Sequence, residues 1–163
     1  MIPREKTTKI AAFLKGASEF DDIPGLKPAL MDWRPAPDMW SIHEHLIHLM
    51  DSEVATFHRF RKAIAEPGGK VIGYAEEKWT ASLAYHDMDV RDALAVFKLL
   101  RKLTAAYLST IVDRDWSAFW FQHDQKGKIS LETWIVDYIA HAATHREYID
   151  RNLKLHAQKK PGT

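Results

Sequence analysis

Apolar residues recur at intervals of three and four positions along four stretches of the chain, the spacing of helices that bury one face. This spacing predicts helices over residues 4–20, 42–65, 90–112 and 131–153. Capping side chains precede three of them: Ser41 with Glu44 in capping-box register, Asp89, and Ser130 with Thr133 nearby. Because no repeat or strand-rich segment interrupts the pattern, we predict an all-α fold, a four-helix bundle.

The same periodicity predicts which side chains of the first three helices are buried. The core-facing positions are Ile10, Phe13, Leu14 and Ala17, then Leu46, Leu49, Met50, Val54, Phe57, Phe60 and Ile64, and then Leu94, Phe97, Leu100, Leu103, Tyr107 and Ile111. On the third helix, Lys98, Arg101 and Lys102 are predicted to face solvent. We therefore expect an ordinary bundle helix there.

Two connections stand out by length or composition. Residues 66–88 are longer than a link between adjacent antiparallel helices requires, which favours a crossover or a lid. Residues 113–128 are rich in aromatic side chains. We expect this segment to form either a flap over one end of the core or a wall of a binding cleft. These aromatic residues are Trp116, Phe119, Trp120 and Phe121.

The length of 163 residues predicts a single domain over residues 1–163. The prolines of residues 21–37 permit only one short turn between the first two helices, around residues 26–33. The polar, basic tail at residues 154–163 is expected to be frayed.

Composition narrows the range of functions. The 23 basic and 22 acidic side chains leave a formal net charge of +1, too little to gather nucleic acid. The absence of cysteine excludes disulfides, thiolate nucleophiles and Cys-ligated zinc, and suits a reducing compartment. No stretch has the apolar length to cross a bilayer, and the N-terminus does not resemble a signal peptide. We expect a cytoplasmic protein that binds neither nucleic acid nor membranes.

His141 and His145 lie four residues apart in the last predicted helix, so both imidazoles project from one face. An imidazole on the core-facing side requires a hydrogen-bond partner or a metal ion. For this spacing alone, two hydrogen-bonded core histidines are the commoner outcome, and a third ligand would favour metal instead. The inward seam that contains both histidines comprises positions 134, 138, 141, 145, 148 and 152.

A second group of histidines opens the second predicted helix, in the segment His43-Glu44-His45-Leu-Ile-His48. It is not a zincin motif, because His43 and His48 are five residues and about 140° apart instead of four residues apart. We choose His48 over His45 as the third ligand, since it lies a turn deeper, with Glu44 and Asp51 on its side. A di-iron bundle is also excluded, because no histidine follows three residues after Glu44, Glu53, Glu132 or Glu147.

The order of these residues resembles the DinB-like (YfiT-like) metal-binding bundles over residues 40–153. The matching motifs are Trp40-Ser41-Ile42 with His48-Leu49, the approach Phe119-Trp-Phe-Gln-His123 followed by Gly127 and Ser130-Leu131, and the terminal His141-x-x-x-His145-Arg146. Many members of the family have Gly-Gln after the terminal His-Arg, where this chain has Glu147-Tyr148. This difference does not involve the metal ligands. The family's substrate contacts therefore do not carry over to Glu147 and Tyr148.

The resemblance implies that His48, His141 and His145 hold one divalent ion, foremost nickel or zinc, with iron and manganese as further options. It also implies an enzyme that activates a small thiol, as a thiol transferase, or a water, as a hydrolase, and acts on a small-molecule substrate. The rival interpretation is a non-catalytic metal-binding or structural bundle.

Glu44, Asp51 and Asp137 are candidates for a general base, although a surface ion pair is the commoner role of a helical carboxylate. A second set of bulky side chains is suited to line a substrate cleft, but such residues are more often simply core in a small bundle. These cleft candidates are Trp79, Trp120, His123, Trp134 and Tyr138.

The other histidines are expected to have ordinary roles. His58 and His86 are interpreted as surface or packing residues, His156 lies in the tail, and His43 faces away from His48. Because bundles of this kind often pair through an outer helix face, we expect a homodimer.

Overall fold

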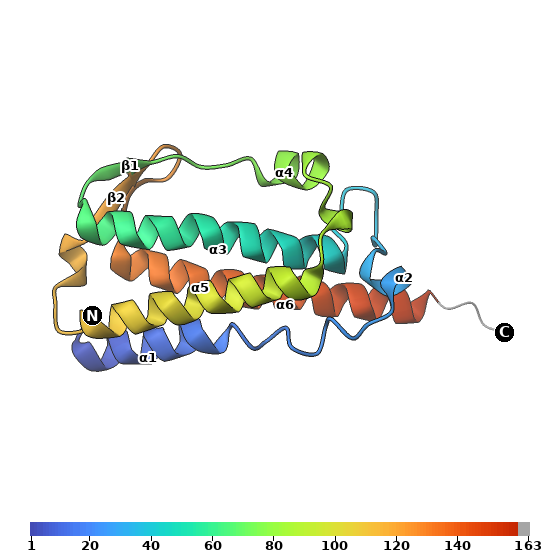
Figure 1. Ribbon diagram of the computed structural model, residues 1–163, viewed down its shortest axis with the longest axis horizontal. Helices are drawn as coiled ribbons and strands as arrows, with labels where there is room; N and C mark the ends of the chain where they lie inside the picture. Colours follow the sequence, from blue (N-terminus) through green and yellow to red (C-terminus); the bar gives the residue numbers. More distant parts are fainter. Residues whose placement is uncertain (160–163) are drawn as a thin grey trace.

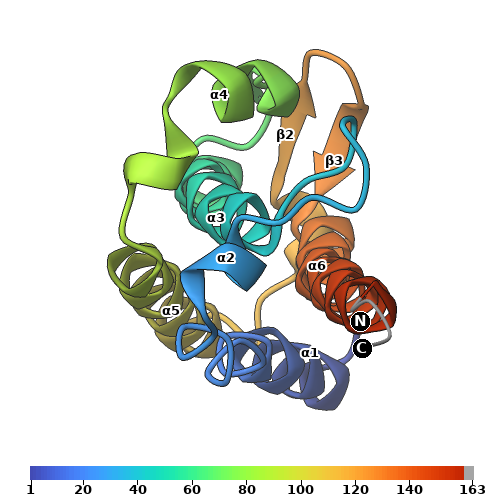
Figure 2. The same ribbon diagram turned by 90° about the vertical axis from the view of Figure 1, so that its right-hand side faces the viewer.

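The computed structural model describes residues 1–159, and its four long helices are α1 (Pro3–Lys15), α3 (Ile42–Ala65), α5 (Val90–Thr110) and α6 (Leu131–Gln158). Seen end on, α3 packs against α5 and α6, and α1 packs against the same two helices from the other side (Figure 2). Helices α3 and α5 run in one direction and α1 and α6 in the other (Figure 1). The predicted four-helix bundle is confirmed. No helix among residues 1–159 is long and apolar enough to span a membrane.

Shorter elements occupy the connections. The link from α3 to α5 contains β1 (Gly69–Val71), α4 (Glu76–Ser82) and the 3-10 helix η1 (Tyr85–Asp87), and it runs back along α3 (Figure 1). Since α3 and α5 are parallel, this link has to cross the length of the bundle, which explains its size. Between α5 and α6 lie the 3-10 helix η2 (Trp116–Ala118), β2 (Trp120–His123) and β3 (Gly127–Ser130). The short helix α2 (Pro28–Met31) lies in the proline-rich linker.

The three strands form one small sheet in the order β1-β2-β3. Strand β1 pairs parallel with β2, with Gly69 opposite Phe121, and β2 pairs antiparallel with β3. Gly127 follows the hairpin turn with a φ of +74°, a conformation that favours glycine. The all-α prediction is wrong for these segments. Strands of three or four residues show no periodicity, and β1 finds its partner some fifty residues away in sequence.

The predicted helix caps are present. The Ser41 hydroxyl accepts a hydrogen bond from the N–H of Glu44, and the Glu44 carboxylate accepts one from the N–H of Ser41 at 2.7 Å. Asp89 and Ser130 each accept a hydrogen bond from a backbone N–H of the helix that follows. Because these contacts are local, the starts of α3, α5 and α6 are set by the sequence next to them.

The last helix is longer than its apolar pattern predicts. It continues to Gln158, so the predicted fraying is wrong for residues 154–158, while residues 160–163 lie outside the described part of the chain. The side-chain amide of Asn152 donates to the carbonyl of Trp40 at 2.8 Å, and His156 packs edge-on against Trp33. These tertiary contacts hold the polar end of α6 in helical conformation.

The first helix is shorter than predicted, because α1 ends at Lys15 and the chain then folds through turns that bury Phe20. Several positions predicted to face the core are more than a third exposed: Leu14, Val54, Leu103, Tyr107 and Tyr148. The opposite error occurs at Arg101, which was expected to face solvent and is fully buried.

Arg101 joins all four helices of the bundle. From α5, its Nε donates to Glu53 Oε2 on α3, its Nη1 to the carbonyl of Phe13 on α1, and its Nη2 to the carbonyl of Tyr138 on α6, each at 2.9 Å. The guanidinium carbon also lies 4.4 Å from the ring centroid of Phe13 and 4.6 Å from that of Phe97. The planar, multiply donating guanidinium is suited to bind acceptors in three directions.

We predict that Arg101→Met lowers the free energy of unfolding by about 3–5 kcal/mol, because it leaves the Glu53 carboxylate buried without its cation. Lys102→Met, at the exposed neighbour on the same helix, should change it by less than about 0.5 kcal/mol. Urea unfolding followed by circular dichroism measures both. Equal stability of the two variants would contradict the anchoring role of Arg101.

Candidate metal centre

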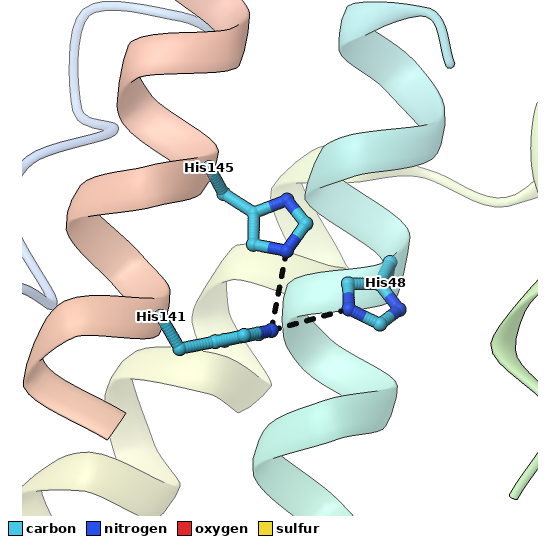
Figure 3. Close-up of side chains that lie close together, drawn as sticks. All are labelled: His48, His141 and His145. Atoms are coloured by element: carbon cyan, nitrogen blue, oxygen red, sulfur yellow. Dashed lines mark hydrogen bonds between the residues drawn. The ribbon is translucent and has the colours of Figure 1, made fainter. Parts of the chain in front are cut away.

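Three histidines from two helices converge inside the bundle (Figure 3). His48 comes from α3, and His141 and His145 come from α6. The Nε2 atom of His141 lies 3.3 Å from Nε2 of His48 and 3.1 Å from Nε2 of His145. The structure thus brings together the three residues selected from the sequence as metal ligands, here called the triad.

The packing of α3 against α6 places the triad. Tyr138 lies one turn before His141, and its backbone carbonyl is held by Arg101. Its hydroxyl shares a hydrogen bond of 2.9 Å with the hydroxyl of Ser52, which lies one turn after His48 on α3. These contacts set the alignment of α3 and α6 one turn away from the triad.

The donor atoms fit a divalent ion of the zinc class. Nitrogen atoms 3.1 to 3.3 Å apart are what metal–nitrogen bonds of about 2.0–2.1 Å at near-tetrahedral angles produce. Nε2 of His141 faces two other Nε2 atoms, and a neutral imidazole nitrogen either donates one hydrogen bond or accepts. A cation shared by the three lone pairs satisfies all of them at once.

His45, the alternative third ligand in the sequence, lies outside the triad but contacts it. Its Nδ1 is 3.0 Å from Nδ1 of His145, so one ring donates to the other. If Nε2 of His145 binds a metal, its Nδ1 carries the proton and donates to His45, which holds the ring in place. The indole of Trp40 packs on the same group, with ring centroids 4.9 Å from His48 and 5.5 Å from His45.

Burial lowers the pKa of all four imidazoles. Loss of hydration brings the pKa of His45 and of His48 to about 4 and that of His141 to about 3. The pKa of His145 is lowered further still, first by burial and then by the neighbouring histidines. The rings are therefore neutral at pH 7, and a neutral imidazole is the form that binds metal.

A cavity of 480 Å³ adjoins the triad, with His141 in its wall. This volume lies in the range of about 300–1,000 Å³ that is typical of small-molecule sites. Two cations surround Trp134 in this cavity: the guanidinium carbon of Arg59 lies 5.4 Å from a Trp134 ring centroid and Nζ of Lys126 lies 5.8 Å from it. The cavity therefore brings an imidazole of the triad together with cationic and aromatic side chains.

The three carboxylates predicted as general bases do not face the triad. Glu44 is bound to its own helix cap and to Arg34. Asp51 accepts a hydrogen bond from the Tyr85 hydroxyl at 2.5 Å. Asp137 is exposed and lines a groove beside the N-terminus. Each of these carboxylates therefore has its contacts or its place away from the triad.

The carboxylate that does approach the triad is Glu76 on α4, whose Oε2 lies 3.7 Å from Nε2 of His48. Glu76 also lines the cavity. Sequence reasoning missed it, because it lies in the long connection and has no periodic relation to the histidines. Only the crossover path of residues 66–88 brings it to this position.

Three of the five predicted cleft residues line the cavity, namely His123, Trp134 and Tyr138. Trp79 and Trp120 do not line this cavity. Along β2 successive side chains point to opposite faces of the strand, so His123 is buried toward the cavity while Trp120 packs on the other side. Trp79 lies on α4 and packs against Tyr74, with the two ring centroids 4.5 Å apart.

We predict that the metal-free protein loses stability as the pH falls from 6.5 toward 4. In this window the unfolded chain, with histidine pKa values near 6.5, binds more protons than the folded chain, so the free energy of unfolding falls with pH. Each buried histidine contributes up to about 1.4 kcal/mol per pH unit. Urea unfolding at pH 7 and pH 5 in the presence of a chelator measures the effect. A constant unfolding midpoint would contradict it.

Comparisons with known proteins agree with this site. The sequence model of the DinB superfamily matches residues 22–149. YfiT of Bacillus subtilis (strain 168), named as a candidate metal-dependent hydrolase, is 26% identical over 110 residues, which cover 68% of this chain and 62% of YfiT. A relative from Oceanobacillus iheyensis with the same kind of name is also 26% identical over 110 residues and is covered to 63%. The matched region spans less than two thirds of the length of these curated relatives.

The fold is shared with a solved structure. The structure of YfiT from Bacillus subtilis, described as a probable metal-dependent hydrolase with an unusual four-helix bundle topology, matches with a TM-score of 0.88 at 21% identity. The match covers 96% of this chain and 90% of that chain. Because the family model covers most of the sequence and the helices adopt this fold, the protein belongs to the DinB superfamily.

Proposed function

We propose that this protein is a divalent-metal-dependent enzyme of the hydrolase type. The observation that carries the proposal is the convergence of three neutral imidazoles beside a cavity of small-molecule size, which His141 lines. His48, His141 and His145 would hold one ion, foremost nickel or zinc. When bound, the ion supplies a positive charge that lowers the pKa of a nucleophile beside it. The names of the relatives support the same reaction class.

Glu76 is the residue that we assign as general base. A general base has to lie within hydrogen-bond reach of the proton that it removes, directly or through one water. Because its Oε2 is 3.7 Å from Nε2 of His48, a nucleophile at the open side of the triad lies within that reach. Its carboxylate would accept the proton released by the attacking water.

The part of the cavity around Trp134 favours an anionic substrate. Arg59 and Lys126 provide positive charge there, and Trp134 and Tyr138 provide an aromatic wall. A carboxylate bound by the two cations would direct the rest of a small molecule along the aromatic wall toward the histidines. We therefore propose a small anionic substrate whose reacting bond lies at the triad.

A small thiol is the second candidate nucleophile, as the family resemblance implies. The cavity volume of 480 Å³ leaves room for a nucleophile larger than water, and Glu76 could remove a thiol proton in the same way. Thiol transfer to a monochlorobimane-like electrophile, assayed beside panels of esters and amides, separates the two reactions. Metal-loaded protein that turns over none of these substrates would favour the non-catalytic bundle. The homodimer and the cytoplasmic location stay predictions from the sequence.

We predict that His145→Ala removes one divalent ion per chain relative to the unaltered protein, because it deletes one of three ligands. His58→Ala, at an exposed histidine on α3, should leave the metal content unchanged. Elemental analysis of protein prepared without a His tag measures both. Equal metal content of the two variants would exclude the triad as a metal site.

We predict that Glu76→Gln keeps the ion but lowers the rate of substrate turnover by about 10²–10⁴-fold, since the amide cannot accept a proton. Glu77→Gln is the matched control, because within residues 1–159 no ion pair joins Glu77 to a histidine. Steady-state kinetics on any substrate that the panels reveal gives the comparison. Similar rates for the two variants would remove Glu76 from the mechanism.

A further inference from the structure

A second group of potential metal ligands lies at the end of the bundle where α2, the start of α3 and the segment before α5 meet (Figure 1). Asp32 follows α2, His43 lies in the first turn of α3, and His86 lies in η1. Oδ1 of Asp32 is 3.3 Å from Nδ1 of His43 and 3.1 Å from Nδ1 of His86. Three segments far apart in sequence thus present two nitrogens and one oxygen to one another.

The outer nitrogens of both rings also face acceptors. Nε2 of His43 lies 3.0 Å from the carbonyl oxygen of Met88, which can only accept, so this nitrogen carries the proton. Nε2 of His86 lies 3.5 Å from a carboxylate oxygen of Glu44. With one proton on each neutral ring, His43 donates from Nε2 to Met88 and His86 donates from Nδ1 to Asp32. Nδ1 of His43 then has no proton, although it lies 3.3 Å from a carboxylate oxygen of Asp32. A cation between this nitrogen and this oxygen, either a metal ion or an added proton, removes the repulsion between them.

We propose that Asp32, His43 and His86 form a second divalent-cation site, of the class that binds Zn²⁺, Ni²⁺ or Co²⁺. Two imidazoles with one carboxylate are a ligand set that such ions accept. With the ion held by both Nδ1 atoms and Oδ1, His43 donates its Nε2 proton to Met88 and His86 donates its own to Glu44. Metal-bound histidines almost always donate the other ring N–H to a carbonyl or a carboxylate in this way.

This site is separate from the triad and is structural. His43 and His48 are five residues apart on α3, so their side chains point about 140° apart around the helix. The side chains of Asp32 and His86 are 52% and 42% exposed, so solvent completes the coordination. An ion here would tie the α2 segment and the end of the crossover to the start of α3. The same crossover carries Glu76 to the triad.

Titration of the full chain with ZnCl₂, followed by calorimetry, tests the proposal. His141→Ala combined with His145→Ala removes the triad, so stoichiometric zinc that remains belongs to another site. We expect this double variant to bind one Zn²⁺ per chain, and Asp32→Asn added to it to weaken binding by at least roughly 10-fold. His86→Ala should have the same effect, and His58→Ala should have none.

Circular dichroism of each variant checks that it is folded. Asp32→Asn keeps the size of an exposed side chain, so weaker zinc binding by this variant reports the loss of the carboxylate. As a second readout, zinc should slow hydrogen exchange at residues 84–88 of the double variant and fail to do so after Asp32→Asn. A double variant that binds no zinc overturns the second site, as does zinc binding that Asp32→Asn and His86→Ala leave unchanged. Either result would mean that His43 and His86 hold protons there and not a metal ion. The double variant lacks the triad, so these experiments do not depend on whether the triad binds metal. That question is tested separately by the metal content of His145→Ala.

Discussion

The buried guanidinium of Arg101 is the contact on which the geometry of the site depends. It binds a carboxylate on α3 and backbone carbonyls on α1 and α6, so the helices of the bundle meet around one charge. A buried charge is costly unless it is paired and hydrogen-bonded, which disfavours helix alignments that leave any of these acceptors without its donor. The carbonyl that Arg101 holds on α6 belongs to Tyr138, one turn before His141. The alignment that satisfies Arg101 is therefore the one that brings His141 to His48.

The interior around the triad gives its histidines their chemistry. Imidazoles removed from water are neutral at pH 7, and their converging lone pairs leave a place suited to a cation. His45 supports the arrangement from behind, through its contact with His145. The neighbouring cavity is lined by charges of both signs, with the carboxylate of Glu76 near the triad and the cations of Arg59 and Lys126 around Trp134.

The parallel course of α3 and α5 has a functional consequence. The connection between these helices has to return along the bundle, and on the way it passes over the triad and supplies Glu76 and Tyr74 to the cavity wall. Further on it brings His86 beside His43 at the end of the bundle. The least periodic part of the sequence thus contributes residues to both candidate sites, because its path is dictated by the helices that it joins.

The sequence by itself determined what depends on neighbouring residues. The cap at Ser41 and the four-residue spacing of His141 and His145 are local, and the order of short motifs pointed to His48. Tertiary structure alone decided the burial of Arg101, the three short strands, the place of Glu76 and the meeting of Asp32 with His43 and His86. A local pattern records which face of an element is apolar. It does not record which distant element will lie against that face, and these features arise only when such elements meet.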